Sequence, residues 1–127
     1  MPLPGRLDLI LYQGDSFERE FLIEQNVDGV NEAVDFTDQE VAAFIRTHQT
    51  SNKVIGVFDI SWPTSEDGED IQDVKNLGIF YASLSSEETE DLPPDCVYDI
   101  HSVDPVDEYT KTWVYGKIKV IRGVTRG

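Results

Sequence analysis

Two alternating runs joined by a turn make up the stretch CVYDIHSVDPVDEYTKTWVYGKIKVIR, residues 96–122. Successive side chains of a strand point to opposite faces. In the first run we therefore expect Cys96, Tyr98 and Ile100 to face a core, with Asp99 and His101 outside. A long final strand is predicted over residues 112–122, with two sets of side chains: Val114, Ile118 and Val120 inward, and Trp113, Tyr115, Lys117 and Lys119 outward.

The same alternation recurs upstream in short runs, with turn residues and no long 3.6-residue pattern between them. Strands are predicted over residues 7–12, 17–23, 53–62 and 78–84, with a hairpin turn at Asp28-Gly29. Residues 65–73 are expected to form a polar loop. Many short alternating strands are typical of an antiparallel sandwich or barrel, so the sequence predicts an all-β domain.

One short helical turn is predicted over residues 86–92. Ser85 and Glu88 have capping-box spacing, and Pro93-Pro94 prevent continuation of the helix. A helical turn leading into a strand that carries Tyr98 is similar to the tyrosine corner of immunoglobulin-like sandwiches. The alternative is that Tyr98 is an ordinary core residue.

The segment TDQEVAAFIRTH, residues 37–48, fits two structures. Thr37 or Asp38 can cap a helix. The alternation of Val41, Ala43 and Ile45 fits a strand equally well, and the neighbouring elements favour the strand.

Length and composition predict a single domain over residues 1–127. Residues 1–6 are expected to form an extended N-terminal arm and residues 123–127 a short basic tail; both either fray or lie on a neighbouring subunit. The single cysteine, Cys96, is expected to be a buried apolar side chain rather than a reactive thiol. No apolar run approaches the roughly 20 residues of a membrane span, and the start is unlike a secretory signal, so a soluble protein made in a reducing cytoplasm is expected.

The charge is strongly acidic and unevenly distributed. The net charge of −15 argues against nucleic-acid binding, because phosphate backbones repel such a surface. Residues 64–107 contain 13 acids and one basic residue, whereas residues 108–127 contain one acid and five basic residues. Such a chain can attract a copy of itself, or a partner, in one orientation. The alternative is an ordinary solvated surface.

Catalytic, cofactor-binding and metal-binding residues are not predicted. The acidic stretches fail the ligand spacing of an EF-hand, which leaves only an adventitious surface calcium site open. Cys96, His48 and His101 lack zinc-ligand spacing, and neither histidine accompanies a nucleophile. We therefore expect a protein that is not an enzyme.

The outward aromatic residues are the strongest candidates for a binding surface. Trp113 and Tyr115 share the outer face of the last predicted strand, and Trp62 ends another. Aromatic residues are common anchors of protein interfaces, so these three with Lys117 and Lys119 form the predicted interface. Sugar binding and internal packing under a covering segment are the alternatives.

Five segments, in order, span nearly the whole chain: LILYQGDSFEREFLI, VDFTDQEVAAFIR, GIFYASLSSEETEDLP, VYDIHSV and YGKIKVIRGVT. Together they resemble small phage and prophage proteins similar to the N-terminal domain of siphophage baseplate upper proteins. The resemblance implies an immunoglobulin-like antiparallel β-sandwich and a structural role in the virion. Its implied partners are other virion proteins, in a homo-oligomer within the assembled particle, without cofactor, nucleic acid or membrane.

The chain departs from that family in the acidic segment of residues 65–73 and in lacking a C-terminal receptor-binding region. A tail, baseplate, adaptor or capsid-associated role is therefore expected rather than receptor recognition. Two alternatives stay open: a carbohydrate-binding or adhesion module, and an acidic DNA-mimic inhibitor of a host enzyme.

Overall fold

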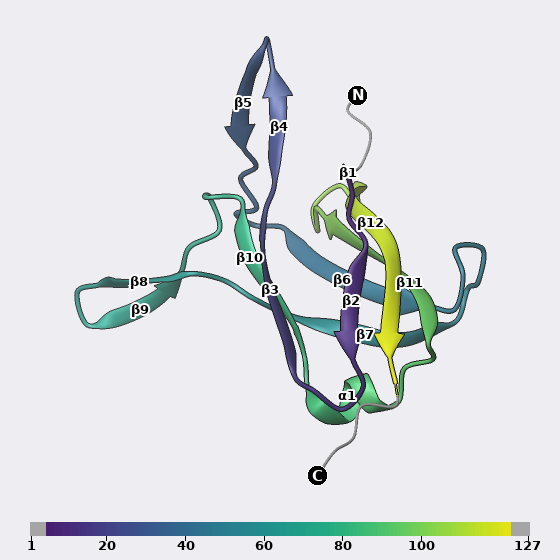
Figure 1. Cartoon of the computed structure of the whole chain (residues 1–127). Helices are drawn as coiled ribbons and strands as arrows, with labels where there is room; N and C mark the ends of the chain where they lie inside the picture. Colours follow the sequence, from purple (N-terminus) through teal and green to yellow (C-terminus); the bar gives the residue numbers. More distant parts are fainter. Residues whose placement is uncertain (1–4, 123–127) are drawn as a thin grey trace.

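The computed structural model describes residues 5–122 and, within them, every side chain except that of Asp67. The first residues of the predicted arm, 1–4, and the predicted tail, 123–127, lie outside the described range. The predicted all-β class is confirmed (Figure 1). The elements, in chain order, are β1 Gly5–Arg6, β2 Leu9–Tyr12, β3 Phe17–Leu22, β4 Glu24–Val27, β5 Val30–Ala33, β6 Glu40–Arg46, β7 Val54–Ser61, β8 Thr64–Asp67, β9 Asp70–Asp73, β10 Ile79–Leu84, α1 Ser86–Glu90, β11 Asp95–Val103 and β12 Thr110–Ile121.

Eight of these strands form one curled sheet. Its hydrogen-bonded order is β1-β12-β11-β6-β7-β10-β3, and β2 also pairs with β12, beyond β1 along the same edge. All neighbours are antiparallel except β1 and β2, which run parallel to β12. The expectation of a purely antiparallel arrangement is therefore wrong at this edge, where the first and last strands of the sheet run in the same direction.

The N-terminal edge is held to β12 by a close backbone approach. Leu7, between β1 and β2, donates its N–H to the carbonyl of Tyr115 at 2.9 Å and accepts a hydrogen bond from the Tyr98 hydroxyl at 2.5 Å. Gly116 lies under this crossing, and a Cβ there would collide with the carbonyl of Leu7. Residues 5 and 6 of the predicted arm are thus a short strand. The Tyr98 hydroxyl bonds to the backbone of Leu7, 91 positions away in the sequence, rather than to nearby backbone, so the similarity to a tyrosine corner does not hold in detail.

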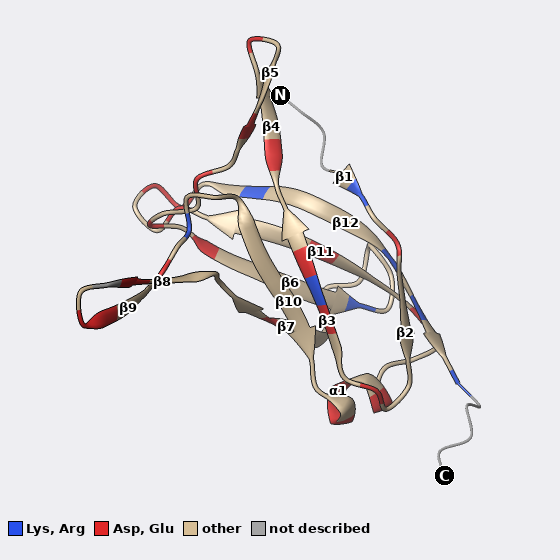
Figure 2. Ribbon diagram, turned by 60° about the vertical axis from the view of Figure 1, so that its left-hand side comes forward, with Lys and Arg blue, Asp and Glu red and all other residues tan. Residues whose placement is uncertain are grey.

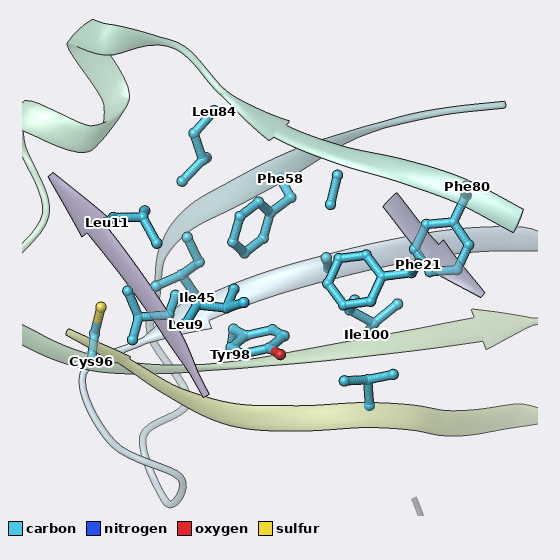
Figure 3. Close-up of a cluster of buried hydrophobic side chains, with 14 of the residues drawn as sticks. Leu9, Leu11, Phe21, Ile45, Phe58, Phe80, Leu84, Cys96, Tyr98 and Ile100 are labelled. Carbon is cyan, nitrogen blue, oxygen red and sulfur yellow. The ribbon is translucent and has the colours of Figure 1, made fainter. Parts of the chain in front are cut away.

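One hydrophobic core fills the concave side of the sheet (Figure 3). The alternation predicted for β10 and β11 is confirmed, because their inward side chains are buried. Phe58 of β7 and Ile45 of β6 meet them from the middle of the sheet. These buried residues include Phe80, Ala82, Leu84, Cys96, Tyr98 and Ile100.

Helix α1 packs at one end of this core. Its capping box is present as predicted, with the Ser85 hydroxyl accepting from the Glu88 N–H and the Glu88 carboxylate accepting from the Ser85 N–H. The buried Thr89 hydroxyl accepts a hydrogen bond from the Gly14 N–H at 3.0 Å and donates to the Asp15 carbonyl at 2.9 Å. The helix therefore holds the turn between β2 and β3.

Residues 37–48 contain strand β6 and no helix, as the neighbouring elements favoured. Val41, Ala43 and Ile45 lie on the side of β6 that faces the core: Ala43 and Ile45 are fully buried, and Val41 packs against the cluster. The β6 backbone forms its hydrogen bonds across the sheet with β7 and β11. These bonds stabilise the segment as a strand rather than as a helix.

Two hairpins project from the sheet without joining it (Figure 1). The β4–β5 hairpin turns at Asp28-Gly29, as predicted, with φ values of +53° and +85° that fit a type I′ turn. The β8–β9 hairpin occupies residues 64–73, where a loop was predicted. That prediction is wrong because a strand with solvent on both faces has no apolar alternation to reveal it.

Candidate protein interface

A network of polar and aromatic side chains lies on the outer face of β6 and β11. The Arg46 guanidinium donates to the Asp99 carboxylate at 2.7 Å, and His101 Nδ1 lies 3.4 Å from the other Asp99 oxygen. The Phe44 ring meets the His101 ring edge to face at 4.9 Å between centroids. All three polar side chains are more than half-buried, so they are held against the sheet rather than fully surrounded by solvent.

The electrostatics of this network favour an ionised carboxylate. Burial raises the pKa of Asp99, but the hydrogen bond with His101 and the charge of Arg46 outweigh it, and the net pKa lies below its ordinary value. Asp99 therefore keeps a negative charge that pairs with Arg46. The Asp99 carboxylate is thus held between Arg46 and His101 on the outer face of the sheet.

An open groove of about 630 Å³ adjoins the network. Tyr115 of β12 forms one side and Arg46 the other, with Val97 and Asp99 between them. The predicted outward direction of Tyr115 is thus confirmed. Residues 44 and 46 were missed by the sequence reasoning, although the alternation of β6 placed them opposite the buried Ala43 and Ile45.

A second open groove, of about 530 Å³, lies beside the first on the outer face of β2, β11 and β12. Lys117 and Lys119 line it and are exposed, as predicted. Ile10 projects next to Lys119, its cross-strand partner, and is 61% exposed, while Tyr12 is 52% exposed. The sequence reasoning missed these two β2 residues, whose signal was their place opposite Leu9 and Leu11 in the alternation.

Trp113 does not share this outer face, and its predicted direction is wrong. The pairing of β11 with β12 shifts register here: Ile100 pairs with Val114 but His101 with Thr112, which leaves Trp113 as an extra residue. Such a β-bulge interrupts the two-residue period. The indole turns inward, and its Nε1–H donates to the hydroxyl of the buried Ser102 at 2.9 Å.

Trp62 and Trp113 instead flank Phe36 at one end of the core. Ring centroids lie 5.7 Å apart for Phe36 and Trp62 and 5.9 Å apart for Phe36 and Trp113. The Lys75 ammonium lies 5.3 Å from the Trp62 ring and the Lys111 ammonium 4.1 Å from the Trp113 ring. The five predicted interface residues therefore form two groups: Tyr115, Lys117 and Lys119 outside, and Trp62 and Trp113 half-buried at the core's rim.

The two hairpins are largely exposed. Each described side chain of β8–β9 is exposed, and Ile71 is 73% exposed. On β4–β5 the cross-strand pair Val27 and Val30 is 40% and 59% exposed. Figure 2 shows acidic residues on β8–β9, on α1 and on several loops.

Other classes of site are not seen in the described part of the chain. Among residues 5–122, no three His, Cys, Asp or Glu side chains lie together in a way that can hold a metal ion. Cys96 is buried, and burial raises the pKa of its thiol to about 11. Over the same residues, no helix has the length and apolar character needed to cross a membrane.

Comparison with known proteins identifies no family. No protein-family model matches the sequence, and no curated protein matches it. Among solved structures, a family 123 glycoside hydrolase from Clostridium perfringens, studied for its hydrolysis of glycolipid glycans, matches at a TM-score of 0.39 and 10% identity. The match covers 94% of this chain and 23% of that one, so this chain spans about a quarter of its length. A likeness this weak carries no argument about fold or activity.

Proposed function

We propose that this protein is a non-enzymatic structural component of a phage particle, acting through contacts with other virion proteins. The observation that carries the proposal is the pair of exposed hairpins that project from the curled sheet. Two-stranded hairpins are at best marginally stable in water on their own. Elements of this kind gain apolar burial when a neighbouring chain covers them, as in an assembled particle.

The resemblance to baseplate upper protein domains supplies the virion context. We further propose that the curled sheet is a form of the immunoglobulin-like β-sandwich that this resemblance implies. The helical turn before β11 and the shared core between β10 and β11 support this assignment. The single domain, the virion location and the homo-oligomer in the particle belong to the same proposal.

The test is quantitative mass spectrometry of purified particles from a strain that carries the gene. The chain is expected at a fixed ratio to the major tail or head proteins, and that ratio should survive a further density gradient. A chain found in the lysate but removed from particles by the gradient would contradict the proposal. A particle from a strain deleted for the gene is the matched control.

Carbohydrate binding is a second candidate because Trp62 and Trp113 both pack against Phe36 at the rim of the core. Aromatic rings in such a position can stack on sugars. Glycan-array binding that is lost in Trp62→Ala, with the fold intact by circular dichroism, would favour this role. The DNA-mimic alternative has no comparable observation in its favour, because the acidic residues are spread over the hairpins, the helix and several loops (Figure 2).

A further inference from the structure

We propose that the β8–β9 hairpin is a docking arm that binds the outer face of β2 and β12 on a second copy of this chain. The proposal rests on the proposed function in one respect, since both require the hairpins to contact other chains. It adds the identity of the partner and the two surfaces that meet.

The arm has the properties of an unpartnered binding element. It stands away from the body of the sheet in both Figure 1 and Figure 2, and it pairs with no other strand among the described residues. Its acidic side chains Glu66, Glu69, Asp70 and Asp73 are exposed. Ile71, at 73% exposure, is its one large apolar side chain. An apolar anchor inside a charged ring is typical of a residue that a partner covers.

The receiving face has the complementary chemistry. Ile10 and Tyr12 are exposed apolar side chains, and Ile10 lies beside Lys119. Lys117 and Lys119 form no ion pair among the described residues. The groove of about 530 Å³ that Ile10, Lys117 and Lys119 line gives an apolar side chain a place to insert.

The local charge on this face is positive although the chain as a whole is strongly negative. Two carboxylates lie here, Asp8 and Asp95. Asp8 is already engaged by the Arg6 side chain at 3.3 Å and by the Lys117 N–H at 2.9 Å, and these bonds lower its pKa. With Arg6, Lys117 and Lys119 set against these two carboxylates, this region is where an acidic arm meets attraction rather than repulsion.

The occupant must be a second copy rather than the same molecule. The arm and the receiving face lie on opposite sides of the molecule in both views (Figures 1 and 2). The two surfaces also differ from each other, so the contact is head to tail. Repeated contacts of this kind close into a ring or continue as a filament.

The test uses two variants that each remove one half of the contact. The arm variant carries Ile71→Ala and Asp70→Asn, and the face variant carries Ile10→Ala and Lys119→Gln. All four positions are exposed, so the fold should be retained. In analytical ultracentrifugation, self-association of the wild-type protein should increase with its concentration. Each variant alone should associate roughly tenfold more weakly or worse, the effect expected on losing an anchor.

Mixing the two variants gives the sharpest outcome. The face variant keeps an intact arm and the arm variant keeps an intact face, so the mixture should form dimers that grow no further. The matched control is Val106→Ala, an exposed apolar residue in the turn between β11 and β12 at 92% exposure, which lies outside both hairpins and the receiving face and should associate like the wild type. Association should also weaken between about 0.1 M and about 1 M salt, as the screening length falls from about 10 Å to about 3 Å.

Three results would overturn the inference. The first is a wild type that stays monomeric at every concentration. This holds even if the monomer binds a different virion protein through the same face. The second is association that both variants leave unchanged. The third is a mixture that fails to restore dimers. Because these measurements need only the purified chain, they can fail while the particle experiment succeeds, and the reverse.

Discussion

The concave side of the curled sheet and the two hairpins differ in what covers their side chains. In the sheet, alternation places one side chain in two against a closed core, and residues such as Phe80 and Ile45 have no exposed surface. In the hairpins both faces meet solvent, and the turn glycines have open space around them. Stability therefore comes from the sheet, and the hairpins are free to change without loss of the fold.

The largest expected effect tests the core side of this comparison. Phe80 is fully buried and its ring stacks on Phe21 at 5.5 Å, with Phe36 and Trp62 at its edges. Phe80→Ala should lower the free energy of unfolding by about 3–5 kcal/mol, from lost burial and the cavity left behind. Chemical denaturation measures the change. Val30→Ala on β4–β5 is the matched control. A similar loss of stability in that variant would contradict the conclusion that stability comes from the sheet and not from the hairpins.

A smaller effect is expected where two backbones approach at the sheet's edge. In Gly116→Ala the new methyl group would overlap the carbonyl of Leu7, so β1 and β2 must shift from β12. We expect a loss of about 1–3 kcal/mol by denaturation, the usual cost of overpacking. Gly5→Ala is the control on the same pair of strands, because its methyl would lie at an ordinary 3.8 Å from the Trp113 carbonyl. Equal losses for both would show that the close approach is not what makes Gly116 necessary.

The sequence allowed the core to be predicted far better than the candidate interface. Inward residues of β10 and β11 followed from alternation because one face of each strand is closed. The direction of Trp113 did not follow from alternation, because a single bulge residue shifts the two-residue period and the local sequence gives no sign of the bulge. The β8–β9 strands gave no signal because neither face is apolar. The outward directions of Tyr115, Lys117 and Lys119 were predicted correctly because β12 is regular beyond the bulge.

The parallel pairing of β1 and β2 with β12 could not be predicted either. It joins residues more than a hundred positions apart, and local alternation says only that both segments are extended. Gly116 and Tyr98 mark the junction, yet each has an ordinary local explanation as a strand glycine or a core tyrosine. Their partner, the backbone of Leu7, became apparent only once the strands were placed.

The hydrogen bond of the buried Tyr98 hydroxyl should make the stability of the curled sheet depend on pH. Burial raises its pKa from 10.0 to about 12, so the folded state favours the neutral phenol that donates to Leu7. Its contribution should be intact below pH 10.0 and be lost as the pH rises through about 12. Tyr98→Phe should cost about 0.5–1.5 kcal/mol at neutral pH, the net value of one hydrogen bond. Denaturation across this range measures it: the difference between wild type and variant should shrink as the pH rises, and a constant difference would contradict the assignment.

The smallest expected effect on stability is at the tip of the proposed docking arm. Ile71→Ala removes a side chain that is 73% exposed and packs on no core residue, so the free energy of unfolding should change by no more than about 0.5 kcal/mol. Native-state hydrogen exchange should agree, with β8–β9 amides exchanging at the rate of local opening and β6 or β11 amides requiring global unfolding. The same variant is expected to weaken self-association strongly. A residue that affects assembly without affecting the fold is an interface anchor, whereas a loss of stability in dilute, monomeric Ile71→Ala would show that the hairpin packs on its own chain.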